Sequence, residues 1–376
     1  MKVRAKKIEL AKSPWLELAV MFVVVILSYI ALLLISRGAA IPPGGMALTS
    51  ITGLLFGFFL LSFAIAIIAV MAGIGGGVIF TPIMLAFTPV DSLIIRATGL
   101  IVAMFSGLVS TGPFMKSGLG NLKLSIYSCC GYGIGGFIGA QCALWVAGRM
   151  GATGEGLVRI VLGGIVLAIA IYFLWGGVKR EWPDVKKVDR FTQRLGLPQP
   201  YYEQSLGKVI DYRVTRAGWG LLAMCGVGLI SGFFGLGAGW AIVPVMNLIV
   251  EVPLKVAAAS SGILIGMGDC ITVWPYLLAG AIIPLFVAPW LVGQVMGGII
   301  GAHVLIRVRA KSIRYILIGI MIFSSFGLVT KGLVSLGYIS SVPGAVQIAV
   351  LLIIMAVVAL AITGKLPQLL GRRRDL

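Results

Sequence analysis

A glycine-rich motif occurs twice in this chain, and the two copies lie 162 residues apart (73 to 235). Residues 73–77 read GIGGG and precede Pro82, and residues 235–239 read GLGAG and precede Pro244. An apolar chain that is duplicated, with a glycine break in each half, is typical of membrane transporters. The same offset relates Ala97-Thr98 to Ala259-Ser260, Pro113 to Pro275, Gly118 to Gly280, Gly131 to Gly293, Gly135-Gly136 to Gly297-Gly298, and Gly139-Ala140 to Gly301-Ala302.

The chain is too apolar for a soluble protein. Apolar residues make up 59% of its 376 residues, and charged residues only 11%. Several apolar runs reach about 20 residues, the length that a helix needs to cross a bilayer. Because backbone that faces lipid must satisfy its own hydrogen bonds, these runs are expected to be helices. The composition therefore predicts an all-α integral membrane protein that crosses the lipid bilayer several times.

The net charge of +18 does not indicate a nucleic-acid partner, because the basic residues cluster beside the apolar runs. The clusters lie at residues 2–12, 179–216, 307–314 and 372–374. Positive charge next to membrane segments is typical of their cytoplasmic side. We therefore expect a multi-pass protein of the bacterial inner (plasma) membrane with both termini in the cytoplasm. The sequence leaves the oligomeric state open.

The apolar segments divide the chain into five parts. We expect an N-terminal cytoplasmic segment with an extra transmembrane helix at 1–50, a first membrane repeat at 51–177, a cytoplasmic linker at 178–216, a second membrane repeat at 217–334, and a last transmembrane helix with a basic tail at 335–376. The parity of the crossings places the start of the first repeat outside and the start of the second inside. The prediction is two repeats of inverted topology.

The segments 78–88 and 240–250 are too short to cross the membrane. Eleven helical residues rise about 16 Å, roughly half of the hydrocarbon thickness. Because their polar ends are expected at opposite faces, both glycine motifs are expected near the bilayer midplane. We predict broken or re-entrant helices whose tips meet there, although the preceding segment 52–72 is long enough to cross by itself.

The two tips predict a binding site for a small anion. A helix that begins after a glycine turn presents free N–H groups and the positive end of its dipole, and glycine lets a ligand approach the backbone closely. Two such helix starts can hold an anion without a full positive charge. The glycines between 131 and 139 are instead expected to allow close helix packing. The expected substrate-binding residues are Gly75, Gly76, Gly77, Thr98, Gly237, Ala238, Gly239, Ser260 and Ser261.

The polar side chains of the membrane segments allow two interpretations each. The hydroxyls of Thr98, Ser260 and Ser261 can donate to an oxyanion or to the backbone of their own helix. Asp269 is an acidic residue deep within a membrane segment, so it is a candidate for proton coupling. Its alternatives are an ion pair with a basic residue and a carboxyl that stays protonated. We expect a proton or a sodium ion as the coupling ion.

Two basic residues near helix ends, Arg96 and Lys331, are expected to extend towards the lipid headgroups. The alternative is that they attract anions into a pathway.

No catalytic or metal-binding constellation is predicted. The five cysteines lie in apolar stretches and are expected to be small buried side chains. His303 is the one histidine, so no cysteine–histidine set has metal-ligand spacing. We therefore expect no metal, no cofactor and no enzymatic activity.

The repeated pattern G-x-G-G/A-G-x4-P, followed by Ala-Thr in one half and Ala-Ser in the other, resembles the sulfite exporter TauE/SafE family over roughly residues 51–334. The resemblance implies an inner-membrane carrier of small sulfur-containing or organic anions such as sulfite, sulfoacetate and related sulfonates. It also implies that residues 75–77 and 237–239 line the substrate site. The chain departs from the pattern at Ala238, which replaces a glycine, and at Gly99, where a second hydroxyl residue is usual.

The sequence as a whole predicts a secondary transporter, with export favoured by the resemblance, that works by alternating access around a midplane anion site. One alternative is an anion channel. Another is a membrane-embedded sulfur-handling enzyme that uses Cys129 or Cys130.

Overall fold

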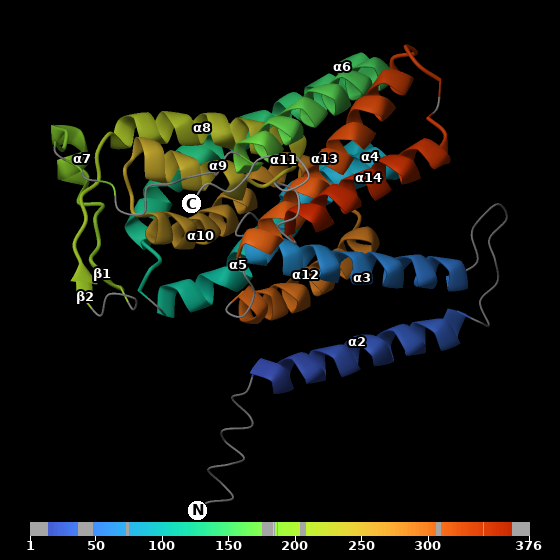
Figure 1. Ribbon diagram of the computed structural model, residues 1–376, viewed down its shortest axis with the longest axis horizontal. Helices are drawn as coiled ribbons and strands as arrows, with labels where there is room; N and C mark the ends of the chain where they lie inside the picture. Colours follow the sequence, from blue (N-terminus) through green and yellow to red (C-terminus); the bar gives the residue numbers. More distant parts are fainter. Residues whose placement is uncertain are drawn as a thin grey trace, which may run out of the picture.

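The protein is a bundle of long helices (Figure 1). The computed structural model describes residues 14–36, 48–72, 75–116, 118–174, 183, 185, 187–203, 208–305, 310–340 and 342–362. Within these residues, eight helices are long and apolar enough to cross a membrane. The prediction of an all-α integral membrane protein is confirmed. The basic segments at both ends of the chain, and most of 175–187, lie outside the described residues.

The first half contains one short helix between long ones, as predicted. At Gly151 the backbone of the longest helix, α6, turns sharply (φ 51°, ψ −133°), and this corner separates two spans, Leu122–Gly151 and Thr153–Leu174. The elements are α2 (Pro14–Ser36), α3 (Leu48–Ala72), α4 (Gly77–Phe87), α5 (Ser92–Lys116) and α6 (Leu122–Leu174).

The second half follows the same order. Its short element is α9 followed directly by the π-helical turn η1, which together are equivalent to α4. The elements are α8 (Ala217–Phe234), α9 (Gly239–Pro244), η1 (Val245–Ile249), α10 (Leu254–Thr272), α11 (Trp274–Leu278), α12 (Pro284–Leu305), α13 (Ala310–Ser335) and, beyond the repeat, α14 (Gly344–Ile362).

Each half packs a glycine stripe onto the first long helix of the other half. The stripe of α6 lies on α8, and the stripe of α12 lies on α3. A Cβ atom placed on any of these glycines would come within 3 Å of a carbonyl oxygen, so only glycine permits the approach. The contacts are Gly131, Gly135 and Gly139 with Leu221, Cys225 and Leu229, and Gly293, Gly297 and Gly301 with Phe59, Phe63 and Ile67. The two sets are related by the 162-residue offset, and the packing role predicted for the glycines of 131–139 is confirmed.

Equivalent helices of the two halves lie antiparallel where they touch. In the pair α5 and α10, Gly107 faces the carbonyl of Gly262 while Met104 contacts Cys270, further along α10. The second span of α6, Thr153–Leu174, also packs antiparallel to α13, since Gly156 faces Gly332 and Gly163 faces Ser325. The halves are therefore interlocked through reciprocal contacts.

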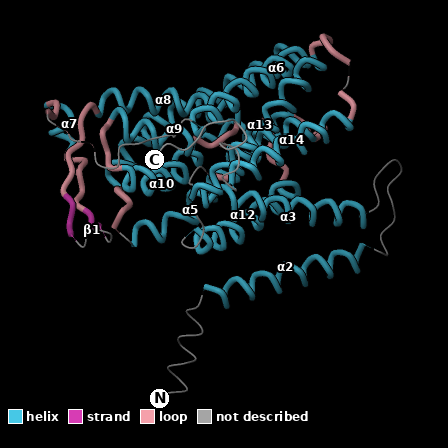
Figure 2. Tube along the Cα trace, in the orientation of Figure 1, coloured by secondary structure: helices cyan, strands magenta, loops and turns pink. Residues whose placement is uncertain are grey.

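The polar linker forms a small structured cap at one end of the bundle (Figures 1 and 2). It contains α7 (Arg190–Leu195) and an antiparallel pair of strands, β1 (Tyr201–Glu203) and β2 (Lys208–Ile210). Asp189 begins α7 by accepting hydrogen bonds from the hydroxyl and the backbone N–H of Thr192. These bonds, together with one from the Arg216 N–H, lower the pKa of the Asp189 carboxyl to about 2.

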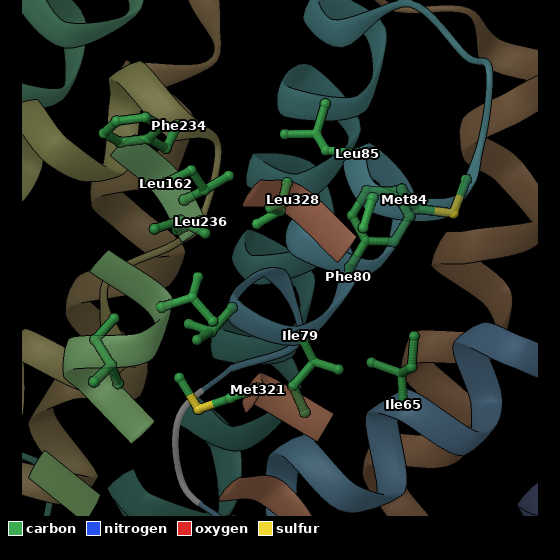
Figure 3. Packing of buried hydrophobic residues seen from close by; sticks show 14 of the residues in the cluster. Ile65, Ile79, Phe80, Met84, Leu85, Leu162, Phe234, Leu236, Met321 and Leu328 are labelled. Atoms are coloured by element: carbon green, nitrogen blue, oxygen red, sulfur yellow. The ribbon is translucent and has the colours of Figure 1, made fainter. Parts of the chain in front are cut away.

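The short helix α4 is enclosed by apolar side chains from other elements (Figure 3). Most of its residues are buried. Phe80 packs edge-on against the indole of Trp290 on α12, with ring centroids 4.5 Å apart. The same cluster includes Leu162 of α6, Leu328 of α13, and Leu236, which lies between α8 and α9. A helix too short to span is thus held inside the bundle instead of facing lipid.

Candidate functional site

The two glycine motifs meet inside the protein. A Cβ atom on Gly77 would lie 2.5 Å from the carbonyl oxygen of Leu236 and 2.7 Å from that of Gly99. The hydroxyl of Thr81, one turn into α4, donates a 2.5 Å hydrogen bond to the carbonyl of Gly235. The start of one short helix therefore touches the turn that leads into the other. Residues 73 and 74, which begin the first motif, lie outside the described residues.

Each tip contacts the long helix of the opposite half near its middle. Gly237 lies against Ala103, close to the centre of Ser92–Lys116. Gly75 lies against Ile265, at the equivalent place in the apolar span Leu254–Leu278. Both contacts lie on helices that contain an apolar stretch long enough to cross a membrane.

The backbone at the tips has the conformation that glycine favours. Gly75, Gly235 and Gly237 have φ values of 78°, 68° and 64°, where a side chain would be strained. At the start of α4, the carbonyl of Gly76 accepts the first bonds of the helix, from Ile79 and Phe80. The N–H groups of Gly77 and Val78, which precede these two donors, have no acceptor within the helix itself.

Two further side chains lie at or near the tips, one against the first tip and one beside the acidic residue next to the second. They are Gln294 on α12 and Tyr132 on α6, which are equivalent by the 162-residue offset. Both have an exposed fraction of 0%. A Cβ atom on Gly76 would lie 2.6 Å from Nε2 and 2.7 Å from Oε1 of Gln294, so this amide lies directly over the first tip. Within the described part of the chain, neither amide atom has a hydrogen-bond partner.

The second tip faces an acidic group. The hydroxyl of Tyr132 lies 2.5 Å from Oδ1 of Asp269 and 2.8 Å from Oγ of Ser231. Oδ2 of Asp269 is buried with no partner among the described residues, and it would lie 3.7 Å from a Cβ atom on Gly237. The structure thus pairs the carboxyl with a tyrosine and not with a basic residue. The sequence contains a signal for Gln294 and Tyr132, because each of them directly follows the first glycine of its glycine stripe.

The hydroxyls named from the sequence bond to backbone in the structure. Thr98 donates to the carbonyl of Ile94, and Ser261 donates to that of Ala258. Ser260 accepts a 3.0 Å bond from the N–H of Asn121, at the start of α6. The bonds of Thr98 and Ser261 stay within their own helices, and only the bond between Asn121 and Ser260 joins α10 to the start of α6. An oxyanion would have to compete with these bonds.

Arg96 does not extend to the headgroups, so that expectation is wrong. Its exposed fraction is 1%. The guanidinium lies 5.6 Å from the centroid of the Phe233 ring, and Nη1 donates a 3.4 Å bond to the Phe233 carbonyl. The negative end of a helix dipole attracts such a charge, and Arg96 therefore covers the C-terminus of α8. Lys331 similarly donates to the carbonyl of Thr88 at the end of α4.

The cysteine expectation is largely wrong. Cys129 is buried, but Cys130, Cys142 and Cys270 are exposed on the bundle surface, where a small side chain is compatible with lipid contact. Among the described residues, no group of three His, Cys, Asp or Glu side chains is placed to hold a metal ion. The side chain of His303 lies outside those residues.

Comparisons with known proteins agree with this architecture. The family model "Sulfite exporter TauE/SafE" matches residues 58–328, which is more than half of the chain. The chain belongs to the TauE/SafE sulfite exporter family. It is also 24% identical over 273 residues to the "Probable membrane transporter protein YunE" of Bacillus subtilis (strain 168), covering 70% of this chain and 93% of that protein. No solved structure matches the chain. The protein is therefore a multi-pass membrane transporter of the TauE/SafE family.

Proposed function

We propose that the protein is a secondary transporter that exports a small oxyanion, such as sulfite, sulfoacetate or another organosulfonate, from the cytoplasm across the bacterial inner membrane. The observation that carries the proposal is the contact between the two glycine tips at the centres of α5 and α10. Two helix starts that converge in a water-excluded interior favour an anion held by backbone N–H groups. Export follows the family description, whose printed name is a sulfite exporter.

Transport by alternating access requires two halves that can move around a fixed site. The antiparallel contacts between equivalent helices support an inverted orientation of the repeats. In our proposal, the halves rock about the α5–α10 contact and open the tips to one face at a time. Both termini and the linker lie in the cytoplasm.

Asp269 is the proposed coupling group. Burial of a carboxylate at this depth is costly unless it is paired or protonated, and its Oδ2 is next to the second tip. Protonation would remove a negative charge beside the anion site. A proton that binds Asp269 would therefore favour anion binding, so the two would move together and the outward gradient of the anion would drive export.

Counterflow in proteoliposomes separates the carrier from an anion channel. Liposomes loaded with unlabelled sulfite should accumulate labelled sulfite transiently above its outside concentration, since a carrier exchanges one for the other. A channel gives equilibration without overshoot. A variant in which all five cysteines are replaced should retain this flux; loss of flux in that variant would favour the sulfur-handling enzyme instead.

Thermal shift tests the site directly, because a ligand that binds the folded state raises its melting temperature. We expect sulfite or an organosulfonate to raise the melting temperature of the detergent-purified protein. Bulky replacements at Gly76 or Gly239 should abolish the shift. Normal ligand-induced shifts in both variants would exclude the tips as the binding site.

A further inference from the structure

The amide of Gln294 is a buried polar group at the first glycine tip. Its side chain is 0% exposed, and neither Nε2 nor Oε1 has a partner in the described part of the chain. A buried amide without hydrogen bonds is destabilising, so such a group is expected where function requires it. The three atoms nearest to a Cβ on Gly76 all belong to this amide. Gln294 is thus directed at the start of α4, an 11-residue helix.

We propose that Gln294 is a ligand of the transported anion and selects a monoprotonated oxyanion, such as hydrogensulfite in its O–H form. This inference rests on the proposed function and specifies the ionic form of the substrate. The primary amide offers one acceptor oxygen and an NH₂ donor side by side. A ligand with one O–H and one neighbouring acceptor oxygen satisfies both atoms at once. The assignment of Nε2 and Oε1 does not matter, because both lack partners.

The charges at the first tip also favour a monoanion. The nearest atoms to Gly76 and Gly77 are the Gln294 amide and the backbone of Leu236 and Gly99, none of which has a formal charge. A helix start supplies about half of a positive charge. This environment compensates a ligand with one negative charge far better than a ligand with two. The second charge would be buried without compensation, which is costly.

The equivalent position in the other half offers no amide without hydrogen bonds. Tyr132 occupies the place of Gln294 there, and its hydroxyl is engaged by Asp269 and Ser231. An anion at the second tip would face the carboxyl of Asp269. The duplicated framework therefore carries an anion-binding amide in one half and an acidic group in the other.

The first measurement needs only the wild-type protein. The affinity of the purified full-length chain for sodium sulfite and for sodium methanesulfonate is measured by calorimetry on both sides of neutral pH. Methanesulfonate keeps one charge and has no O–H in this range, so it reports any titration of Arg96, Asp269 or Tyr132 around the site. We expect the affinity for sulfite, relative to methanesulfonate, to rise as pH falls and hydrogensulfite accumulates. Equal pH dependence for the two ligands would overturn the proposal.

The second measurement uses Gln294→Leu, with Gln141→Leu at an exposed position of α6 as the matched control. Loss of the hydrogen bonds should weaken sulfite binding by about tenfold to a hundredfold. Because the variant removes an unpaired buried amide, its melting temperature without ligand should stay the same or rise, whereas a purely structural residue would lower it. The control should leave affinity unchanged.

The outcomes separate this inference from the proposed function. If Gln294→Leu binds sulfite normally while a bulky replacement at Gly76 does not, the tip remains the anion site and the role of Gln294 is wrong. If the wild-type chain binds neither sulfite nor methanesulfonate, both proposals are wrong.

Discussion

At the scale of single residues, Gly77 is one of the positions where the two halves approach closely at the site. A methyl group there would overlap the carbonyls of Leu236 and Gly99. We expect Gly77→Ala to lower the free energy of unfolding by about 1–3 kcal/mol, because an overpacked site forces backbone shifts, and to abolish the sulfite-induced rise in melting temperature. Gly112→Ala on α5, where no atom lies within 4 Å of the added Cβ, is the control and should retain the rise.

Asp269 provides a second prediction at this scale. Asp269→Asn keeps the size of the side chain and a group that can accept the bond from Tyr132 but cannot exchange a proton. We expect the variant to fold and to exchange sulfite in counterflow, while net uphill sulfite flux driven by an imposed proton gradient falls to the background. Unchanged gradient-driven flux would exclude Asp269 as the coupling group.

At the scale of elements, the glycine stripes hold the two halves together. A Cβ on Gly135 would lie 1.9 Å from the carbonyl of Cys225, and one on Gly297 would lie 2.4 Å from that of Phe63. We predict that Gly135→Ala and Gly297→Ala each destabilise the protein by about 1–3 kcal/mol. Thermal unfolding in detergent measures this, with Gly148→Ala, which meets nothing within 4 Å, as the control. A neutral effect at either stripe position would contradict the reciprocal packing.

The linker helix α7 gives a prediction of pH dependence. The pKa of Asp189 is lowered to about 2 in the folded protein, first by the hydrogen bond from the Thr192 hydroxyl. A lowered pKa means that the contribution to stability is present above the unfolded value of about 4 and is lost as pH falls through about 2. The protection factors of the Thr192 and Arg216 backbone amides against hydrogen exchange should therefore fall below about pH 4 in the wild-type chain. In Asp189→Ala the same amides should have low protection factors at every pH in this range.

The two short segments were largely predictable from the sequence, because spanning length and the 162-residue repeat indicate where the apolar helices break. The glycine tips were recognisable for the same reason. Gln294 and Tyr132 were missed, because the sequence alone does not show whether a polar residue among the stripe glycines faces the neighbouring helix or the glycine tips. The role of Arg96 was missed because the end of α8 that it covers is distant in sequence, and only the packing of α5 on that end brings the charge there.

At the scale of the whole molecule, the inverted orientation of the halves predicts that equivalent loops open at opposite membrane faces. Gly118 and Gly280 are related by the 162-residue offset and have open space where a Cβ would be. Their φ values of 71° and 70° strain a side chain to the same extent at both positions, so the two variants form a matched pair. In a chain without other cysteines, a membrane-impermeant maleimide applied to intact cells should label Gly280→Cys and not Gly118→Cys. Labelling of both variants to the same extent would exclude inverted topology.

The most direct test of the account is a structure of the protein determined with saturating sulfite and compared with one determined without it. We predict additional density between the Gln294 amide and the first turn of α4, within about 3 Å of the N–H groups of Gly77 and Val78, the normal length of such hydrogen bonds. Sulfite density at another place, with none at the tips, would contradict the central claim.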